Sequence, residues 1–198
     1  MDPNNYNSED FSGATPEPTE DNQTPNRAGE GLIQAALREI FLVFLPALVL
    51  AVVIHLFLAQ ATVVYGQSME PNLHDHQRLI IEKVSYRLRP PNRGEIVVVD
   101  MPSMDEKLIK RVIGLPGDTI SIDMGVVSIN GVALDETYVF NPDRRTIPAQ
   151  VVPEGQYFVM GDNRGNSNDS RNFGPVTLDQ LVGRAWVRYW PLSDFTIF

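Results

Sequence analysis

A serine in a turn bounded by glycine and proline is the first group in this chain that could act as a nucleophile. The segment GQSMEP at residues 66–71 contains Ser68. Glycine permits backbone angles that other residues avoid and proline fixes one, so the turn would hold the Ser68 hydroxyl exposed on a loop. A serine hydroxyl attacks only when a neighbouring base takes its proton. The chemistry therefore depends on which base lies near Ser68.

Histidine is the usual base, and His74 and His76 follow Ser68 with Asp75 between them. These residues contain the members of a serine–histidine–aspartate triad. However, only a few residues separate the histidines from Ser68, which leaves little chain to fold an imidazole back onto the hydroxyl. The pair could also bind a metal, but two histidines without a third ligand nearby make a weak site. We expect ordinary histidines of a surface loop.

Lysine is the second candidate base, and the chain has only three: Lys83, Lys107 and Lys110. Alternation along a strand at residues 107–113 places Lys110 on the same face as Leu108 and Val112. Burial among apolar side chains disfavours the ammonium form and lowers the lysine pKa toward the range that a general base needs. Lys83 also shares a face with apolar residues, so alternation does not separate these two lysines. The alternative is a strand lysine whose stem lies along apolar surface.

A polar segment at residues 161–175, GDNRGNSNDSRNFGP, is unusually rich in side chains that form hydrogen bonds. It does not fit a calcium loop, because Arg164 stands where a ligand belongs and no later glutamate closes the site. It also lacks the residue order of a phosphate-binding loop. Such a density of donors and acceptors indicates a network that holds something in place. No cofactor and no metal are expected.

From residue 61 to residue 198 the sequence favours β-structure. Short β-branched runs are separated by turn residues such as Asn130-Gly131. No convincing amphipathic helix lies between them, so we predict a mainly β domain of antiparallel strands, folded as a barrel or sandwich. The runs predict strands at residues 78–84, 95–100, 108–113, 119–122, 126–129, 157–160 and 185–189.

The first 60 residues divide into an acidic tail and an apolar segment. Residues 1–31 carry seven acids against one base and few large apolar side chains, which predicts a disordered tail. Residues 32–60 are long and apolar enough to cross a bilayer as one transmembrane helix. Ala59-Gln60-Ala61 has the form of a signal cleavage site. The length of the apolar segment and the acidic tail before it favour a retained anchor over a cleaved signal.

The overall composition argues against several classes of function. The 16 Lys+Arg residues are outnumbered by 25 Asp+Glu, which gives a formal net charge of -9. A protein that binds the phosphate backbone needs a basic surface, so no nucleic acid partner is expected. The chain has no cysteine, which excludes a disulfide framework, a thiol nucleophile and cysteine-bound zinc.

The chain resembles the bacterial type I signal peptidases, also called leader peptidases. These are serine–lysine enzymes that release secreted proteins from their leader peptides. The resemblance rests on four segments that follow a membrane span in order: GQSMEP at 66–71, RGEIVVV at 93–99, KRVIGLPGD at 110–118 and GDNRGNSNDSR at 161–171.

The resemblance implies a role for each matching residue. Ser68 would be the acylating nucleophile, and Lys110 would be its general base and later the acid that protonates the leaving amine. The supporting residues would be Ser167, which orients Lys110, Asp169 and Arg171, which form an ion pair beneath the site, and Gly161 and Asp162, which open the loop. In some family members a serine or threonine two residues before the nucleophile donates to the oxyanion, and this chain has Gly66 there. The oxyanion site would then rest on the Ser68 backbone N–H and a further donor.

The resemblance also implies the substrate and the cellular setting. Secretory preproteins would bind as an extended leader with small residues at the first and third positions before the cut. Val64, Met69, Leu73, Leu108 and Ile109 flank the catalytic residues and are candidate pocket walls. A single-pass monomer in a cell or thylakoid lipid bilayer is expected, with the N-terminus cytoplasmic and the catalytic domain on the extracytoplasmic or lumenal side.

Two other functions fit parts of the sequence. A self-cleaving serine–lysine regulator would need a DNA-binding domain, and the acidic tail and apolar segment argue against one. A membrane-tethered β-module that only binds peptides would have no need of Ser68, Lys110 and Ser167.

Overall fold

The computed structural model describes residues 27–53, 58–102 and 104–198. Most of the predicted acidic tail therefore lies outside the described residues. The chain divides into two compact units: the first ends at Pro46 and the second begins at Ala47. We describe the N-terminal helix and the β-domain separately.

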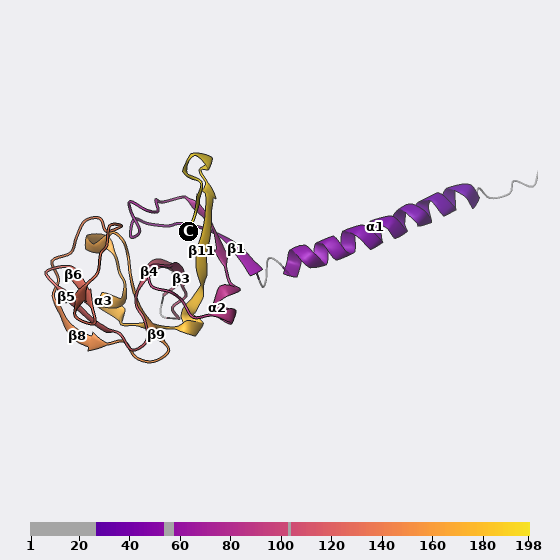
Figure 1. Cartoon of the computed structure of the whole chain (residues 1–198). Coiled ribbons are helices and arrows are strands. Elements are labelled where there is room, and N and C mark those ends of the chain that lie inside the picture. Colours follow the sequence, from indigo (N-terminus) through magenta and orange to yellow (C-terminus); the bar gives the residue numbers. More distant parts are fainter. Residues whose placement is uncertain (1–26, 54–57, 103) are drawn as a thin grey trace, which may run out of the picture. The chain divides into compact units, whose positions relative to one another are not determined.

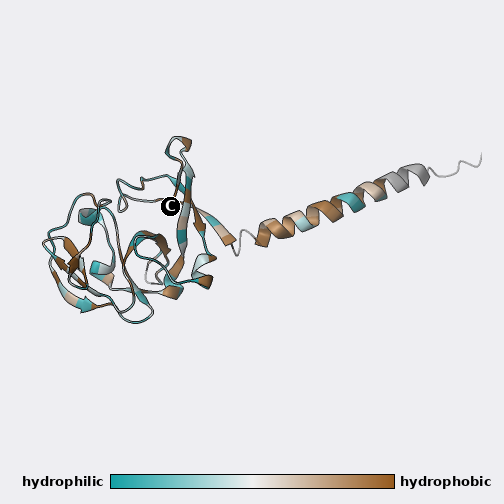
Figure 2. Ribbon diagram, viewed as in Figure 1, coloured by the Kyte–Doolittle hydropathy of each residue, from teal (hydrophilic) through white to brown (hydrophobic). Residues whose placement is uncertain are grey.

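Helix α1 spans Arg27–Val53 and contains Pro46. It begins before residue 32, the start of the predicted anchor. Its segment Ile33–Val53 has a mean hydropathy of 2.3, and its side chains are exposed to the surroundings. Figure 2 shows apolar residues along most of this helix. By length and composition, α1 is able to cross a membrane.

The larger of two antiparallel sheets carries the residues of interest. Its strand order is β1-β2-β11-β3-β4-β9-β10, and β12 pairs with β11. The strands are β1 (Ala59–Val63), β2 (Arg78–Glu82), β3 (Ile96–Val99), β4 (Leu108–Gly114), β9 (Gln156–Met160), β10 (Val176–Thr177), β11 (Leu181–Trp190) and β12 (Thr196–Ile197).

A smaller sheet is inserted in the chain between β4 and β9. Its order is β7-β6-β5-β8, with β5 (Thr119–Asp123), β6 (Val126–Ile129), β7 (Val132–Ala133) and β8 (Ile147–Val151). Figure 1 shows β5, β6 and β8 at one end of the domain and β1 and β11 at the other, with β3, β4 and β9 between them. The helical turns of the domain are short: α2 (Ser85–Leu88), η2 (Arg164–Asn166), α3 (Ser170–Phe173), η3 (Leu178–Gln180) and η4 (Leu192–Asp194).

The antiparallel β fold predicted from the sequence is confirmed, and each predicted run overlaps a strand. The structure also has strands that the β-branched pattern does not reveal. β1 starts at Ala59, inside the predicted anchor, and pairs along its whole length with β2. The Ala59-Gln60-Ala61 sequence is therefore part of the sheet.

Strands β3 and β4 lie at the centre of the domain, among its apolar clusters. All four residues of β3 are buried, with Ile96 and Val98 in one apolar cluster and Val97 and Val99 in another. A strand buried on both faces reads as a continuous apolar run, as this one does. Val97 is the direct partner of Lys110 on β4. Because β3 is fixed by packing on both faces, it gives Lys110 a rigid support.

Candidate active site

The loop that carries Ser68 connects β1 to β2 and is fixed by local hydrogen bonds. Gly66 has a φ of 79°, a left-handed conformation that favours glycine. Its N–H donates to Asp75 Oδ1 at 3.0 Å. From the opposite side, the backbone N–H of Asn163 donates to Ser68 O at 3.0 Å, and Asn163 Nδ2 donates to Gln67 O at 3.1 Å. Ser68 is therefore held between its own loop and a second, distant loop.

Lys110 reaches Ser68 from β4. Its Nζ lies 2.8 Å from Ser68 Oγ, within hydrogen-bond distance. Lys110 is 2% exposed. Burial is the main cause that lowers its pKa from 10.5 to about 8, and the nearby Arg171 lowers it further, while Asp169 and Asp162 act in the opposite direction. The site thus brings a serine hydroxyl and a lysine with a depressed pKa into contact.

The other candidate bases do not contact the hydroxyl. His74 Nδ1 lies 3.7 Å from Glu70, and His76 Nε2 lies 3.3 Å from Asp75. Both histidines are exposed. Among the residues that the structure describes, Ser68 Oγ has Lys110 Nζ as its hydrogen-bond partner.

The loop after β9 lies beneath the two catalytic candidates. Gly161 has no room for a side chain, because a methyl group there would collide with Ser167 Oγ and with the Ser68 carbonyl oxygen. The Gly161 N–H donates to Asp169 Oδ2 at 2.9 Å. Arg171 binds both oxygens of Asp169, at 2.8 and 2.7 Å. Gly161 thus lets Ser167 and Ser68 approach the same point.

Ser167 lies close to the site, and its hydroxyl group has no clearly defined hydrogen-bond partner. Its hydroxyl oxygen is buried and forms no hydrogen bond of standard geometry with the described residues. It is nevertheless near Asp169. Burial raises the pKa of Asp169, but Arg171, the Gly161 N–H and the Ser167 hydroxyl more than offset this, so the pKa is lowered. The orientation of Lys110 by Ser167 stays a prediction.

Asp162 connects the loop to the strand of Lys110. It is fully buried and accepts two hydrogen bonds from Arg111, at 2.8 and 2.6 Å. Asn72, four residues after the nucleophile, donates to the same carboxylate at 2.9 Å. Asp162 therefore links the nucleophile loop, β4 and the loop after β9.

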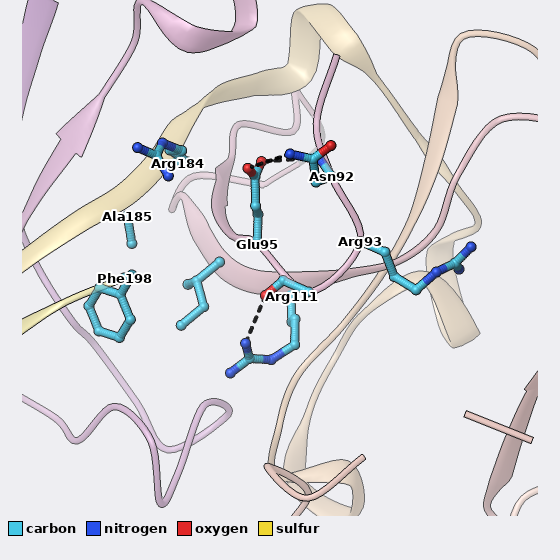
Figure 3. A pocket seen from close by; sticks show the side chains of 9 residues that line it. Asn92, Arg93, Glu95, Arg111, Arg184, Ala185 and Phe198 are labelled. Atoms are coloured by element: carbon cyan, nitrogen blue, oxygen red, sulfur yellow. Dashed lines mark hydrogen bonds between the residues drawn. The ribbon is translucent and has the colours of Figure 1, made fainter. Parts of the chain in front are cut away.

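Arg111 follows Lys110 in β4 and so points to the other face of the strand. Figure 3 shows it in a cavity of about 430 Å³ together with Glu95 and Arg184. Arg111 donates to Gly94 O at 2.8 Å, and Arg184 Nε lies 3.2 Å from Glu82. Arg111 is thereby tied to the turn before β3, whereas the Arg184–Glu82 pair joins β11 to β2.

An open cleft of about 490 Å³ gives access to Ser68 and Lys110. Of the predicted pocket walls, Leu108 lines this cleft, and Ile109 lines an adjacent cavity of about 220 Å³. Val64, Met69 and Leu73 are buried in the apolar cluster that contains β2 residues. The remaining cleft lining is largely polar: Tyr65, Gly66, Gln67, Asp75, Asn166 and Asn168.

Comparison with known proteins decides the family. A family model described as signal peptidase, peptidase S26, matches residues 37–190. The chain belongs to this family. Signal peptidases cleave signal peptides, so the chain is a protease whose substrates are preproteins that carry such peptides. Together with family membership, α1 indicates association with a membrane.

Individual relatives agree with the family model. A probable signal peptidase I-2 from Synechocystis sp. is 47% identical over 152 residues, which cover 74% of this chain and 70% of the relative. A signal peptidase I from Leptolyngbya laminosa is 43% identical, with 74% and 76% covered. The thylakoidal processing peptidase 1 of Arabidopsis thaliana is 35% identical over 69% of this chain and 43% of its own length. A solved signal peptidase I from Enterococcus faecalis V583 matches 48% of this chain and 97% of its own, with 34% identity and a TM-score of 0.43.

Sequence reasoning missed several residues that support the site. Asn72, Arg111, Glu136, Asn141 and Asp143 all bond to the loop after β9 or to its ion pairs. Asn72 and Asp162 are 90 residues apart in the chain. Asn72, Glu136, Asn141 and Asp143 are polar residues in loops, where nothing in the local sequence distinguishes them from solvated ones. Arg111 lies in β4 directly after Lys110, inside the KRVIGLPGD segment, and that position was the signal for it.

Proposed function

We propose that this signal peptidase is a membrane-anchored endopeptidase that uses Ser68 as nucleophile and Lys110 as general base. Its substrates would be secretory preproteins, which it would cut after small-x-small sequences. The observation that carries the proposal is the 2.8 Å separation between Lys110 Nζ and Ser68 Oγ in an open cleft. A base must lie within about 3.2 Å of the proton that it removes.

Acylation would begin with Lys110 in its neutral form. The amine takes the proton of Ser68 Oγ as this oxygen attacks the carbonyl carbon of the scissile bond, and the carbonyl oxygen becomes an oxyanion. When the oxyanion collapses, the carbon–nitrogen bond breaks, and the Lys110 ammonium gives its proton to the leaving amine. That amine is the new N-terminus of the mature protein, and the leader stays esterified to Ser68.

Deacylation would repeat the same proton transfers with water. Lys110 takes one proton from the attacking water, and when the second oxyanion collapses this proton passes to Ser68 Oγ. The leader leaves as a carboxylic acid, which loses its remaining proton to solvent. Ser167 supports this cycle in our proposal: its hydroxyl is buried beside Asp169 and would turn to bond to Lys110 as the charge on the amine changes. Asp169 and Arg171 would hold the loop of Ser167 in place.

The oxyanion would bind to the Ser68 backbone N–H. Gly66 has no side chain to supply a second donor, so this single backbone group must be held firmly. Loss of one such donor costs on the order of 100-fold in rate. In the cleft of about 490 Å³, Leu108 would limit the side chains next to the cut to small ones, and Ile109 would act from the adjacent cavity of about 220 Å³.

The chain would have three parts: a cytoplasmic tail at residues 1–31, an anchor at 32–60 and a catalytic domain at 61–198 on the extracytoplasmic or lumenal side. We propose a monomer, because one chain supplies both Ser68 and Lys110.

The test is cleavage of a leader-bearing preprotein by the detergent-solubilised chain. Ser68→Ala and Lys110→Ala should each abolish cleavage after a small-x-small sequence, whereas the control Lys83→Ala should leave it intact. Cleavage by Lys110→Ala at the rate of the unchanged protein would remove Lys110 as the base. A folded wild type without any cleavage would point to a binding module.

A further inference from the structure

Asn163 binds both carbonyl groups on either side of the Ser68 Cα atom. Its Nδ2 donates to Gln67 O at 3.1 Å, and its backbone N–H donates to Ser68 O at 3.0 Å. Asn163 is 5% exposed. The Gln67 carbonyl and the Ser68 N–H belong to one planar trans peptide group, in which they point in opposite directions. The Glu70 N–H also donates to the Gln67 oxygen, at 3.2 Å, so these two bonds together set the direction of the Ser68 N–H.

Asn141 determines which way the Asn163 side chain is turned. An asparagine amide has one oxygen that accepts and one nitrogen that donates. Asn141 Nδ2 donates to Asn163 Oδ1 at 3.0 Å. With its oxygen engaged by Asn141, the Asn163 amide presents its nitrogen to Gln67.

The chain makes specific room for Asn141. Its φ is 51°, a left-handed conformation that asparagine tolerates better than most residues. Gly165 lies against it, because a Cβ at Gly165 would be 2.6 Å from Asn141 Nδ2. The Gly165 N–H also donates to Asn141 O at 2.8 Å. The absence of a side chain at Gly165 lets the Asn141 amide reach Asn163.

We propose that Asn141 and Asn163 are positioning residues that align and polarise the Gln67–Ser68 peptide group as the oxyanion donor. Linked hydrogen bonds polarise one another, so the pair strengthens the donor as well as directing it. This inference rests on the proposed function. It also explains how the site works with Gly66, since one firmly aligned backbone donor replaces part of what a hydroxyl at that position would supply.

The test compares isosteric variants of the full chain in detergent. In Asn163→Asp a carboxylate oxygen would face Gln67 O, and in Asn141→Asp the donor to Asn163 is lost. Asn141→Gly keeps the left-handed backbone and removes the amide. We expect kcat on a leader-bearing preprotein to fall on the order of 10-fold or more in each variant, with KM changed less than about twofold, because the interaction belongs to the transition state.

Asn130→Gly is the matched control. Asn130 is also left-handed, with a φ of 53°, and its amide bonds to Asp118 at 2.9 Å on the smaller sheet. This variant should keep kcat. Asn141 is exposed, so its variants should fold, which thermal melting would verify even if Asn163→Asp does not fold.

A pair of inhibitors separates alignment of the donor from general loosening of the loop. Ser68 Oγ adds to the aldehyde carbon of a leader-like peptide aldehyde, the Ser68 proton passes to Lys110, and the carbonyl oxygen becomes an oxyanion. The same peptide with a methyl group in place of the aldehyde forms no such adduct. The asparagine variants should weaken the binding of the aldehyde peptide by about the same factor as kcat and leave the affinity of the methyl peptide unchanged. Equal weakening of both inhibitors, or an unchanged kcat, would overturn this inference. If Ser68→Ala cleaves as fast as the wild type, the proposed function itself fails.

Discussion

In the proposed mechanism, Lys110, which is 2% exposed, must lose its proton to act, and this would couple catalysis to pH. The pKa of Lys110 is lowered to about 8, mainly by burial. Below this pH the ammonium form cannot accept the Ser68 proton, so we expect kcat/KM to fall about tenfold per pH unit below about 8 and to level off above it. A pH series from 6 to 10 with one preprotein measures this. Activity that is constant from pH 6 to pH 8 would contradict the neutral-amine mechanism.

Burial of the Lys110 ammonium group should also lower the stability of the folded protein. A pKa of about 8 in place of 10.5 corresponds to about 3 kcal/mol against folding. The unfolded lysine binds more protons than the folded one between these two values, so this cost is complete below about pH 8 and disappears as pH rises to 10.5. We expect inactive Lys110→Met to melt at a higher temperature than the wild type at pH 7, with a smaller difference at pH 10. A lower melting temperature at pH 7 would show that the contact with Ser68 outweighs the burial cost.

Gly161 is the residue where Ser167 and the Ser68 carbonyl come closest. Gly161→Ala should push both apart, lowering kcat on the order of 100-fold and the free energy of unfolding by about 1–3 kcal/mol. Gly183→Ala is the control, since its methyl group would meet the Glu82 carbonyl away from the site. The control should lose stability but keep its kcat. Equal kcat losses in both variants would mean that Gly161 acts only through stability.

Among the secondary-structure elements, the segment between β7 and β8 supports the loop after β9, which we call the catalytic loop. Glu136 in this segment binds Arg164, and side-chain exposures of 10% and 2% make the pair largely buried. Removing one partner leaves a buried charge, so Glu136→Ala should lower the free energy of unfolding by about 3 kcal/mol or more. Asp100→Asn breaks the exposed pair with Lys107 and should change the free energy of unfolding by less than about 1 kcal/mol. Chemical unfolding measures the free energy of unfolding of both variants. Equal losses would contradict the supporting role of Glu136.

The sequence reveals elements whose residues lie close together in the chain. β3 and β4 are readable because their β-branched runs are packed on two faces. β1 is not, because Ala59-Gln60-Ala61 lacks β-branched residues and pairs only through its backbone with one neighbour. The motifs around Ser68 and Lys110 also consist of residues that are close together in the chain, so the sequence reveals them. The bonds of Asn72 and Asn141 to the catalytic loop depend on folding over long separations, which no local pattern encodes.

For the whole molecule, the absence of cysteine makes the proposed orientation directly measurable. Single substitutions Ser8→Cys and Ser193→Cys would mark the tail and an exposed position in the catalytic domain. A maleimide that cannot cross membranes should label Ser193→Cys from the extracytoplasmic side, and Ser8→Cys only after the membrane is opened. The reverse labelling pattern would contradict a cytoplasmic N-terminus.

The two hairpin tips of the smaller sheet differ in how much extra chain they can accept. At the Met124-Gly125 tip, a methyl group on Gly125 would collide with the Asp143 carbonyl, and Asp143 binds Arg171 of the catalytic loop. At the Asn130-Gly131 tip, a methyl group on Gly131 would meet nothing within 4 Å. The second tip is therefore the place to graft a fluorescent reporter or an affinity tag that follows the working enzyme in its own membrane.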